Sequence, residues 1–187
     1  MSQGSVLYRF HLELSDIDRG VYCPLDFRLA MHPSETVTYL GARVIAYALN
    51  HGPDLAFAAG GIADDELPAI SSPDPRGGFT LWIEIGAPSA KRLRKAMNAA
   101  QTVKVYVHRD PQGLVRELRS ANLRRLEALE IYSFAKGFFE EIGSWLERDN
   151  TWLILLSDGL LSVSDGTRSA QSEITRLNLQ ALIGDRA

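Results

Sequence analysis

A segment near the N-terminus alternates between apolar and polar side chains with the period of a β-strand. In Val6–Leu14 the apolar side chains fall on one face and Arg9, His11 and Glu13 on the other. This alternation predicts a half-buried strand. A polar turn at 16–20 separates it from a second apolar stretch, Val21–Met31. Because the two stretches lie so close along the chain, we predict an antiparallel hairpin.

Helical spacing replaces alternation after this hairpin. Apolar side chains recur at Val37, Leu40, Val44 and Ala48. Pro33 suits the first turn of a helix, and Gly52-Pro53 ends one. We therefore expect the helix to open within 32–36. This interpretation places Glu35 in the first helical turn, where a negative charge complements the helix dipole.

The remaining chain alternates between predicted strands and helices, with no repeat or linker that divides it. Strands are predicted over 55–59, 79–85, 102–107, 130–134, 152–156, 160–163 and 172–177. Helices are predicted over 90–100, 114–126 and 136–146. Prolines and glycines predict a turn or loop over 71–78. This order indicates a single α/β domain spanning 1–187, with a mixed sheet, packed helices and antiparallel strands added at both ends.

Composition narrows the class of protein. A chain of 187 residues with 45% hydrophobic and 23% charged residues is long and apolar enough for one globular core. The net charge of −3 provides no overall field that attracts nucleic acid. Cys23 is the only cysteine, which excludes an intrachain disulfide and a cysteine-based zinc site. Because neither a membrane span nor a secretory leader pattern is visible, we expect a cytoplasmic protein.

The candidate chemistry centres on Glu84, one carboxylate inside the apolar strand 81–86. A buried carboxylate costs free energy unless it is paired or binds a cation. An acidic turn, 64–66, lies upstream, and a basic helix follows. Glu35, Asp65 and Glu84 occupy three consecutive elements, and such an order can bring them together. Carboxylates with a nearby lysine indicate a Mg²⁺ or Mn²⁺ site that acts on phosphodiesters.

Each of these features also has a purely structural interpretation. Glu35 can serve the helix dipole alone, the acidic turn can be solvated, and the strand face of Glu84 can be partly open to solvent. The basic cluster 91–95 can be a solvated helix surface. A second basic patch either binds phosphates or neutralises the charge of neighbouring acids. It comprises Arg116, Arg119, Arg124 and Arg125. No serine or cysteine nucleophile motif is present in the sequence.

Four short segments together resemble the YaeQ family of bacterial proteins, and the likeness runs over nearly the whole chain. The segments are His32-Pro33-Ser34-Glu35-Thr36, Ala63-Asp64-Asp65-Glu66, Leu81-Trp82-Ile83-Glu84-Ile85-Gly86 and Lys91-Arg92-Leu93-Arg94-Lys95-Ala96. The resemblance implies a compact α/β fold that varies the restriction-endonuclease-like core of the PD-(D/E)xK superfamily. It also implies a metal-dependent reaction on phosphodiester substrates.

Carried over residue by residue, the resemblance makes Glu35 the helix acid, Asp65 the first strand acid and Glu84 the second. Gly86 stands where the superfamily has its lysine, so the basic group would come from the following helix, first Lys95 and then Arg92. The acidic turn also differs from the family's usual sequence, because Leu67 stands where the family usually has proline and Pro68 follows one place later.

Two functions follow as expectations. The leading one is a nuclease or related phosphodiesterase in which the three acids bind Mg²⁺ or Mn²⁺ and Lys95 or Arg92 assists at the phosphate. The alternative is a catalytically inactive nuclease-like module that binds nucleic acid or a protein partner. The missing strand lysine and the net charge of −3 favour the module, whereas the retained acids favour the enzyme.

Overall fold

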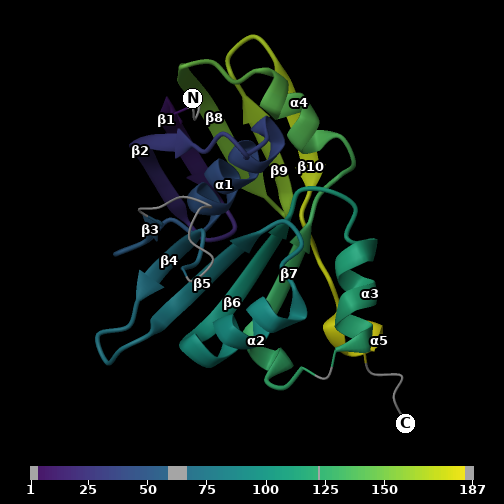
Figure 1. The fold of residues 1–187 in the computed structure, drawn as a ribbon. Helices are drawn as coiled ribbons and strands as arrows, with labels where there is room; N and C mark the ends of the chain where they lie inside the picture. Colours follow the sequence, from purple (N-terminus) through teal and green to yellow (C-terminus); the bar gives the residue numbers. More distant parts are fainter. Residues whose placement is uncertain (1–3, 59–66, 122, 184–187) are drawn as a thin grey trace.

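The computed structural model describes residues 4–58, 67–121 and 123–183 (Figure 1). The strands are β1 (Val6–Asp16), β2 (Val21–Met31), β3 (Ala56–Phe57), β4 (Ile70–Pro73), β5 (Phe79–Ile85), β6 (Ala100–Val107), β7 (Leu129–Ser133), β8 (Asp149–Ser157), β9 (Leu160–Ser164), β10 (Ser169–Glu173) and β11 (Thr175–Arg176). The helices are α1 (Val37–Leu49), α2 (Ala90–Ala99), α3 (Gln112–Ser120), α4 (Phe138–Ser144) and α5 (Leu179–Ile183).

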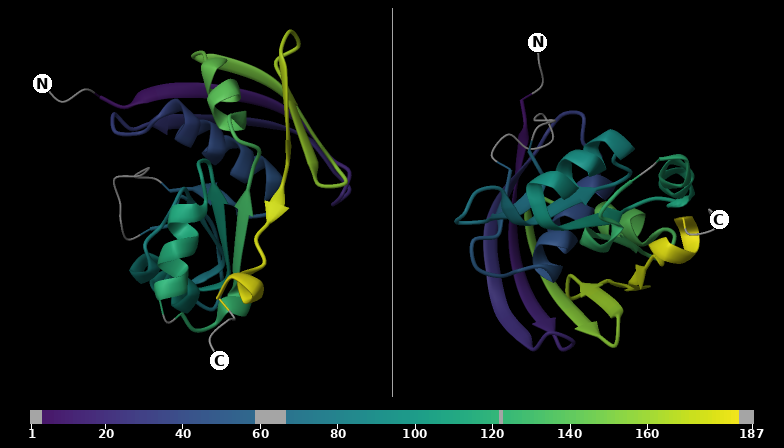
Figure 2. Two further views of the ribbon diagram at one scale, coloured as in Figure 1. Left: turned by 90° about the vertical axis from the view of Figure 1, so that its right-hand side faces the viewer. Right: turned by 90° about the horizontal axis from the view of Figure 1, so that it is seen from below.

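These strands form two sheets. Sheet A has the order β10-β9-β8-β1-β2, and sheet B has the order β11-β7-β6-β5-β4-β3. Sheet A is antiparallel except for the pair β1 and β8. In sheet B, β5, β6 and β7 run parallel, so their carboxyl ends meet at one edge. Figure 2 shows sheet A curving over α1, with sheet B on the opposite side of that helix.

Helix α1 is buried on nearly all sides because it lies between the sheets. Its buried residues are Leu40, Gly41, Ala42, Arg43, Val44, Ile45, Ala46, Ala48 and Leu49. One core joins the apolar side chains of this set to Phe10 and Trp152 of sheet A and Ile83 of sheet B. A second core covers the other face of sheet B, where α2 and α3 pack on Val105. The sheet B strands are therefore covered on both faces, as parallel strands require.

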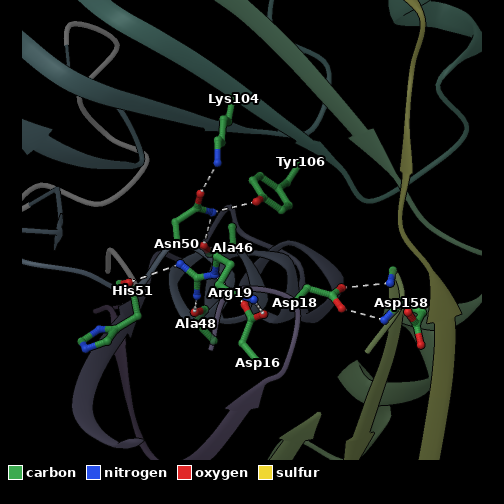
Figure 3. A network of polar contacts seen from close by, with 11 residues as sticks. Asp16, Asp18, Arg19, Ala46, Ala48, Asn50, His51, Lys104, Tyr106 and Asp158 are labelled. Atoms are coloured by element: carbon green, nitrogen blue, oxygen red, sulfur yellow. Dashed lines mark hydrogen bonds and ion pairs between the residues drawn. The ribbon is translucent and has the colours of Figure 1, made fainter. Parts of the chain in front are cut away.

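Polar contacts join the sheets around the C-terminal end of α1 (Figure 3). Arg19 donates to the buried Asp16 carboxylate at 2.6 Å and to the carbonyls of Ala48 and His51 at 3.4 Å. Its cationic group therefore lies at the negative end of the helix dipole. Nearby, Asp18 accepts hydrogen bonds from the backbone N–H groups of 158 and 159, at 2.7 and 2.9 Å. Two turns of sheet A are thus tied together.

The same end of α1 is tied to sheet B. The Asn50 amide donates to the Ala46 carbonyl and to the Tyr106 hydroxyl, both at 2.7 Å, and accepts from Lys104 Nζ at 2.8 Å (Figure 3). Burial would make each of these groups costly without a partner. The network therefore fixes how α1 sits on sheet B.

The structure confirms the mixed α/β class and most predicted elements, including the N-terminal hairpin. Several details were wrong. The predicted helix 114–126 ends at Ser120, and the predicted strand 172–177 is divided between β10 of sheet A and β11 of sheet B. Helix α1 starts at Val37 with Thr36 as its N-cap, so Glu35 precedes the helix. Part of the predicted 71–78 loop is strand β4, which pairs with β5. The terminal strands are not additions to one sheet, because β1, β2 and β8–β10 build a sheet of their own.

Within the described ranges, no helix is long and apolar enough to cross a membrane.

We predict that Ile45→Ala destabilises the protein by about 2–5 kcal/mol, because it opens a cavity between the sheets where Ile45 is fully buried. The matched control is Ile17→Ala, at a turn residue that is 50% exposed, which should change stability by no more than about 0.5 kcal/mol. Urea denaturation of both variants measures the difference. Equal losses would contradict the central position of α1.

Candidate functional site

The candidate site lies at the carboxyl end of β5, where Glu84 is buried at 4% exposure. Its Oε1 accepts a hydrogen bond from Trp82 Nε1 at 2.5 Å and one from Arg92 Nε at 2.8 Å. Trp82 stands two residues earlier on the same strand, so it shares a face with Glu84. Arg92 comes from the first turn of α2. The carboxylate is therefore held by its own strand and by the next helix.

The fold places Arg92 there through a tight turn. Gly86 has a positive φ of 90°, a conformation that suits glycine, and the Ser89 hydroxyl then caps α2 by accepting from the Arg92 backbone N–H at 3.2 Å. Arg92 also donates through Nη2 to the Leu67 carbonyl at 2.8 Å. The guanidinium thus joins β5, α2 and the segment that leads into β4.

Burial raises the pKa of Glu84 above its ordinary value, although hydrogen bonds from Arg92 and Trp82 and the charge of Lys95 oppose this rise. Desolvation disfavours the ionised form more than these partners restore it. The carboxylate is therefore short of positive charge. An added cation at this position would favour ionisation.

Glu35 lies in a second buried ion pair. Its Oε1 accepts from Arg43 Nη1 at 2.7 Å, and its Oε2 accepts from the His32 backbone N–H at 2.6 Å. Arg43 reaches it from inside α1 and also donates to the Ala30 carbonyl at 3.3 Å. Both oxygens of Glu35 are already hydrogen-bonded, so this acid supports the turn between β2 and α1.

Tyr39 connects the two ion pairs electrostatically. Burial raises the pKa of its phenol to about 12, with Arg43 and Arg92 lowering it and Glu35 and Glu84 raising it. All four charges therefore act on one side chain. The phenol stays protonated at neutral pH and remains a hydrogen-bond donor beside the site.

The structure thus brings together part of the predicted set. Arg92, the second choice for the migrated basic group, contacts Glu84 directly, while the charge of Lys95 acts on it through space. Asp65, with Asp64 and Glu66, lies outside the described residues. Among the described residues, no group of three histidine, cysteine or acidic side chains is arranged to hold a metal ion.

Arg43 and Tyr39 were not predicted from the sequence as site residues. Arg43 had a detectable signal, because a single arginine inside an otherwise apolar helix needs a buried partner. Tyr39 had none, since a tyrosine in a helix is unremarkable in composition.

A second polar cluster lies on sheet B, facing sheet A, and it was missed as well. Lys104 Nζ lies 3.9 Å from Glu130, and the Tyr132 hydroxyl donates to the same carboxylate at 2.7 Å. Burial lowers the pKa of Lys104. Lys104 and Tyr132 line a pocket of about 250 Å³ that also includes Asp16 and Arg19. These polar groups pair with one another, so the cluster serves the junction between the sheets.

Oxygen donors and nearby cations define what the Glu84 site can do. The hydrogen bonds from Trp82 and Arg92 to Glu84 both end on Oε1, and no residue in the described ranges donates to Oε2. A carboxylate oxygen is a suitable ligand for a hard divalent cation. Arg92 and Lys95 add positive charge of the kind that binds a phosphate. The described residues therefore fit such a cation at Glu84 better than at Glu35.

The raised pKa of Glu84 predicts a pH-dependent stability. The folded protein holds this proton more tightly than the unfolded chain, so the unfolding free energy falls as pH rises from 4.5 through the raised value. Glu84→Gln removes this titration. We expect the stability of the variant relative to wild type to increase with pH across that window, as measured by urea denaturation. A difference that decreases with pH would contradict the assignment.

Comparison with known proteins identifies the family. The family model described as YaeQ protein matches residues 1–174. Proteins described as "Uncharacterized protein YaeQ" from Salmonella typhi and Escherichia coli (strain K12) are each 24% identical over 176 residues, covering 94% of this chain and 97% of theirs.

Two crystal structures of YaeQ proteins have closely similar folds. The protein from Xanthomonas axonopodis pv. citri gives a TM-score of 0.85 at 26% identity, over 92% of this chain and 98% of its own. The protein from Pseudomonas syringae gives 0.83 at 27% identity, over 93% and 96%. The chain belongs to the YaeQ family.

Proposed function

We propose that the protein is a metal-dependent nuclease or related phosphodiesterase of the PD-(D/E)xK type, with its reaction centre at Glu84. The observation that carries the proposal is the buried Glu84 carboxylate at the carboxyl end of β5, held by Arg92 of the next helix at 2.8 Å. Ligands of open α/β sheets bind outside the carboxyl ends of parallel strands. This edge of sheet B is therefore where a substrate is expected.

Each side chain has a distinct role in this proposal. Glu84 offers Oε2 to Mg²⁺ or Mn²⁺, while Trp82 and Arg92 fix the carboxylate through Oε1. When bound, the cation polarises a phosphoryl oxygen and lowers the pKa of its water. Lys95 supplies positive charge toward the scissile phosphate. Asp65, outside the described residues, is the proposed second acid.

Glu35 acts on this reaction centre indirectly, without touching the cation. Its carboxylate is bound to Arg43 and to backbone, so we propose that it positions Tyr39 and the start of α1 rather than binding the cation. The protonated Tyr39 phenol is then available to donate to a phosphate oxygen.

The second candidate is an inactive nuclease-like module that binds nucleic acid or a protein partner. Its supporting observation is that Glu35 and Glu84 are each already paired with an arginine, at 2.7 and 2.8 Å. Such pairs keep a buried acid satisfied without a cation.

Cleavage of labelled single- and double-stranded DNA and RNA in Mn²⁺ tests the leading proposal. We expect the wild type to cleave at least one substrate and Glu84→Gln to lose about 10²-fold or more of the rate, because the variant offers no charged ligand. The matched control is Glu13→Gln, at an exposed position on β1 in sheet A, which should cleave like the wild type. Equal cleavage by Glu84→Gln would point to a contaminating nuclease.

Thermal unfolding with and without Mn²⁺ separates the two candidates. A cation at about 100 times its Kd stabilises the folded protein by about 2.7 kcal/mol, which raises Tm by several degrees for a chain of this length. We expect this shift in the wild type and in Glu13→Gln but not in Glu84→Gln. No shift in the wild type would favour the inactive module.

A further inference from the structure

A pocket of about 380 Å³ opens at the carboxyl ends of β6 and β7. Its lining includes none of the residues assigned to the proposed reaction centre at Glu84. The pocket is lined by 107–111, 134–137, Phe139 and Glu140. Figure 1 shows the two connections that form it, one leading from β6 to α3 and the other from β7 to α4. Its volume lies at the lower end of the range for small-molecule sites, about 300–1,000 Å³, which suits a ligand of modest size.

The cationic side chains of this pocket are available to a ligand. Arg109 and Lys136 are exposed, and no hydrogen bond or ion pair joins either of them to another described residue. The acids are placed differently. Asp110 accepts from the Gln112 backbone N–H at 2.9 Å at the start of α3, and Glu140 lies in the first turn of α4. Both acids thus complement helix N-termini.

His108 contributes a polar group that lacks a partner in the protein. Its Nδ1 is buried without a hydrogen bond, and a Cβ on Gly86 would come within 3.2 Å of its Cε1. The Tyr39 ring meets the imidazole edge-on at 5.6 Å between centroids. Burial lowers the pKa of His108, so the ring is neutral at physiological pH. His108 therefore lines the pocket with one ring nitrogen, Nδ1, that has no hydrogen-bond partner among the described residues.

An apolar wall completes the pocket. Phe134 is partly exposed; its ring is stacked parallel to Phe138 at 6.0 Å between centroids and meets Phe139 edge-on at 4.8 Å, and Pro111 lies on the other stretch of the lining. A flat ring can stack on an exposed aromatic face, and such stacking is worth about 1–3 kcal/mol for a nucleobase. The pocket therefore combines a platform for a flat ring with cations for an anion.

We propose that this pocket binds a nucleotide unit, with the base against Phe134, the phosphate between Arg109 and Lys136, and His108 hydrogen-bonded to the ligand. The phosphate ester and flat ring can come from a free nucleotide or from the end of a nucleic-acid strand. Because His108 packs against Gly86, two residues after Glu84, a strand held here would pass the Glu84 site. The proposal concerns binding and stands whether or not Glu84 supports cleavage.

Calorimetric titration of the full chain in EDTA tests the proposal without a contribution from divalent cations. The probes are 5′-AMP, ribose 5-phosphate and a 5′-phosphorylated DNA tetranucleotide. We expect saturable binding of 5′-AMP or the tetranucleotide, with ribose 5-phosphate weaker than 5′-AMP by about tenfold because it lacks the base. Tighter binding of the tetranucleotide identifies a strand end as the ligand, and tighter binding of 5′-AMP identifies a free nucleotide.

The decisive variant is Arg109→Gln with Lys136→Gln, since both side chains are exposed and neither makes a hydrogen bond or ion pair with another described residue. It should weaken binding of the tighter probe by about tenfold or more. The control, Arg28→Gln with Arg148→Gln, removes equal charge from exposed positions outside the pocket, and it should bind like wild type. No binding by folded wild type, or equal binding by the decisive variant, would overturn the proposal.

Discussion

The burial of one carboxylate, Glu84, is the constraint around which the carboxyl edge of sheet B is organised. An ionised group at 4% exposure needs partners, and the chain supplies them locally from Trp82 and Arg92. The turn at Gly86 and the cap at Ser89 follow from this need, because they start α2 where its first turn reaches back to β5. The same glycine leaves room for His108, which brings the end of β6 against the end of β5.

Local sequence patterns were sufficient for much of the fold. Alternation predicted β1, the short separation between β1 and β2 predicted their hairpin, and the apolar run with its flanking turn residues predicted β5 with its observed bounds. Long-range arrangement was not predictable in this way. The pairing of β1 with β8 joins segments about 140 residues apart, and nothing in either strand states that the two will form a separate sheet. Strand β4 was missed because Pro73 and Pro75 resemble loop residues, although Pro73 sits at the end of the strand, beside a bulge.

In the candidate site too, local sequence predicted some features, whereas others depended on the tertiary arrangement. Glu84 was recognisable because a charge in an apolar strand demands compensation, and the basic helix that follows was the nearest source. The choice between Lys95 and Arg92 depended on side-chain reach, which sequence does not give. Lys104 alternates with valines along β6, and its face of the strand packs against α1, where the Asn50 side-chain oxygen accepts a hydrogen bond from the ammonium group. Glu35 was assigned a helical position, and its true partner, Arg43, lies on the buried face of α1. Whether an acid is compensated by a cation or by an arginine is therefore a tertiary property.

The central claim is that Glu84 Oε2 is a cation ligand, and diffraction from crystals soaked in Mn²⁺ tests it most directly. Anomalous difference density reveals where the ion binds, independently of any activity. The account predicts a peak within coordination distance of Glu84 Oε2, with Arg92 still bonded to Oε1, and no such peak in Glu84→Gln crystals. A peak elsewhere on the molecule that persists unchanged in the variant would contradict the account.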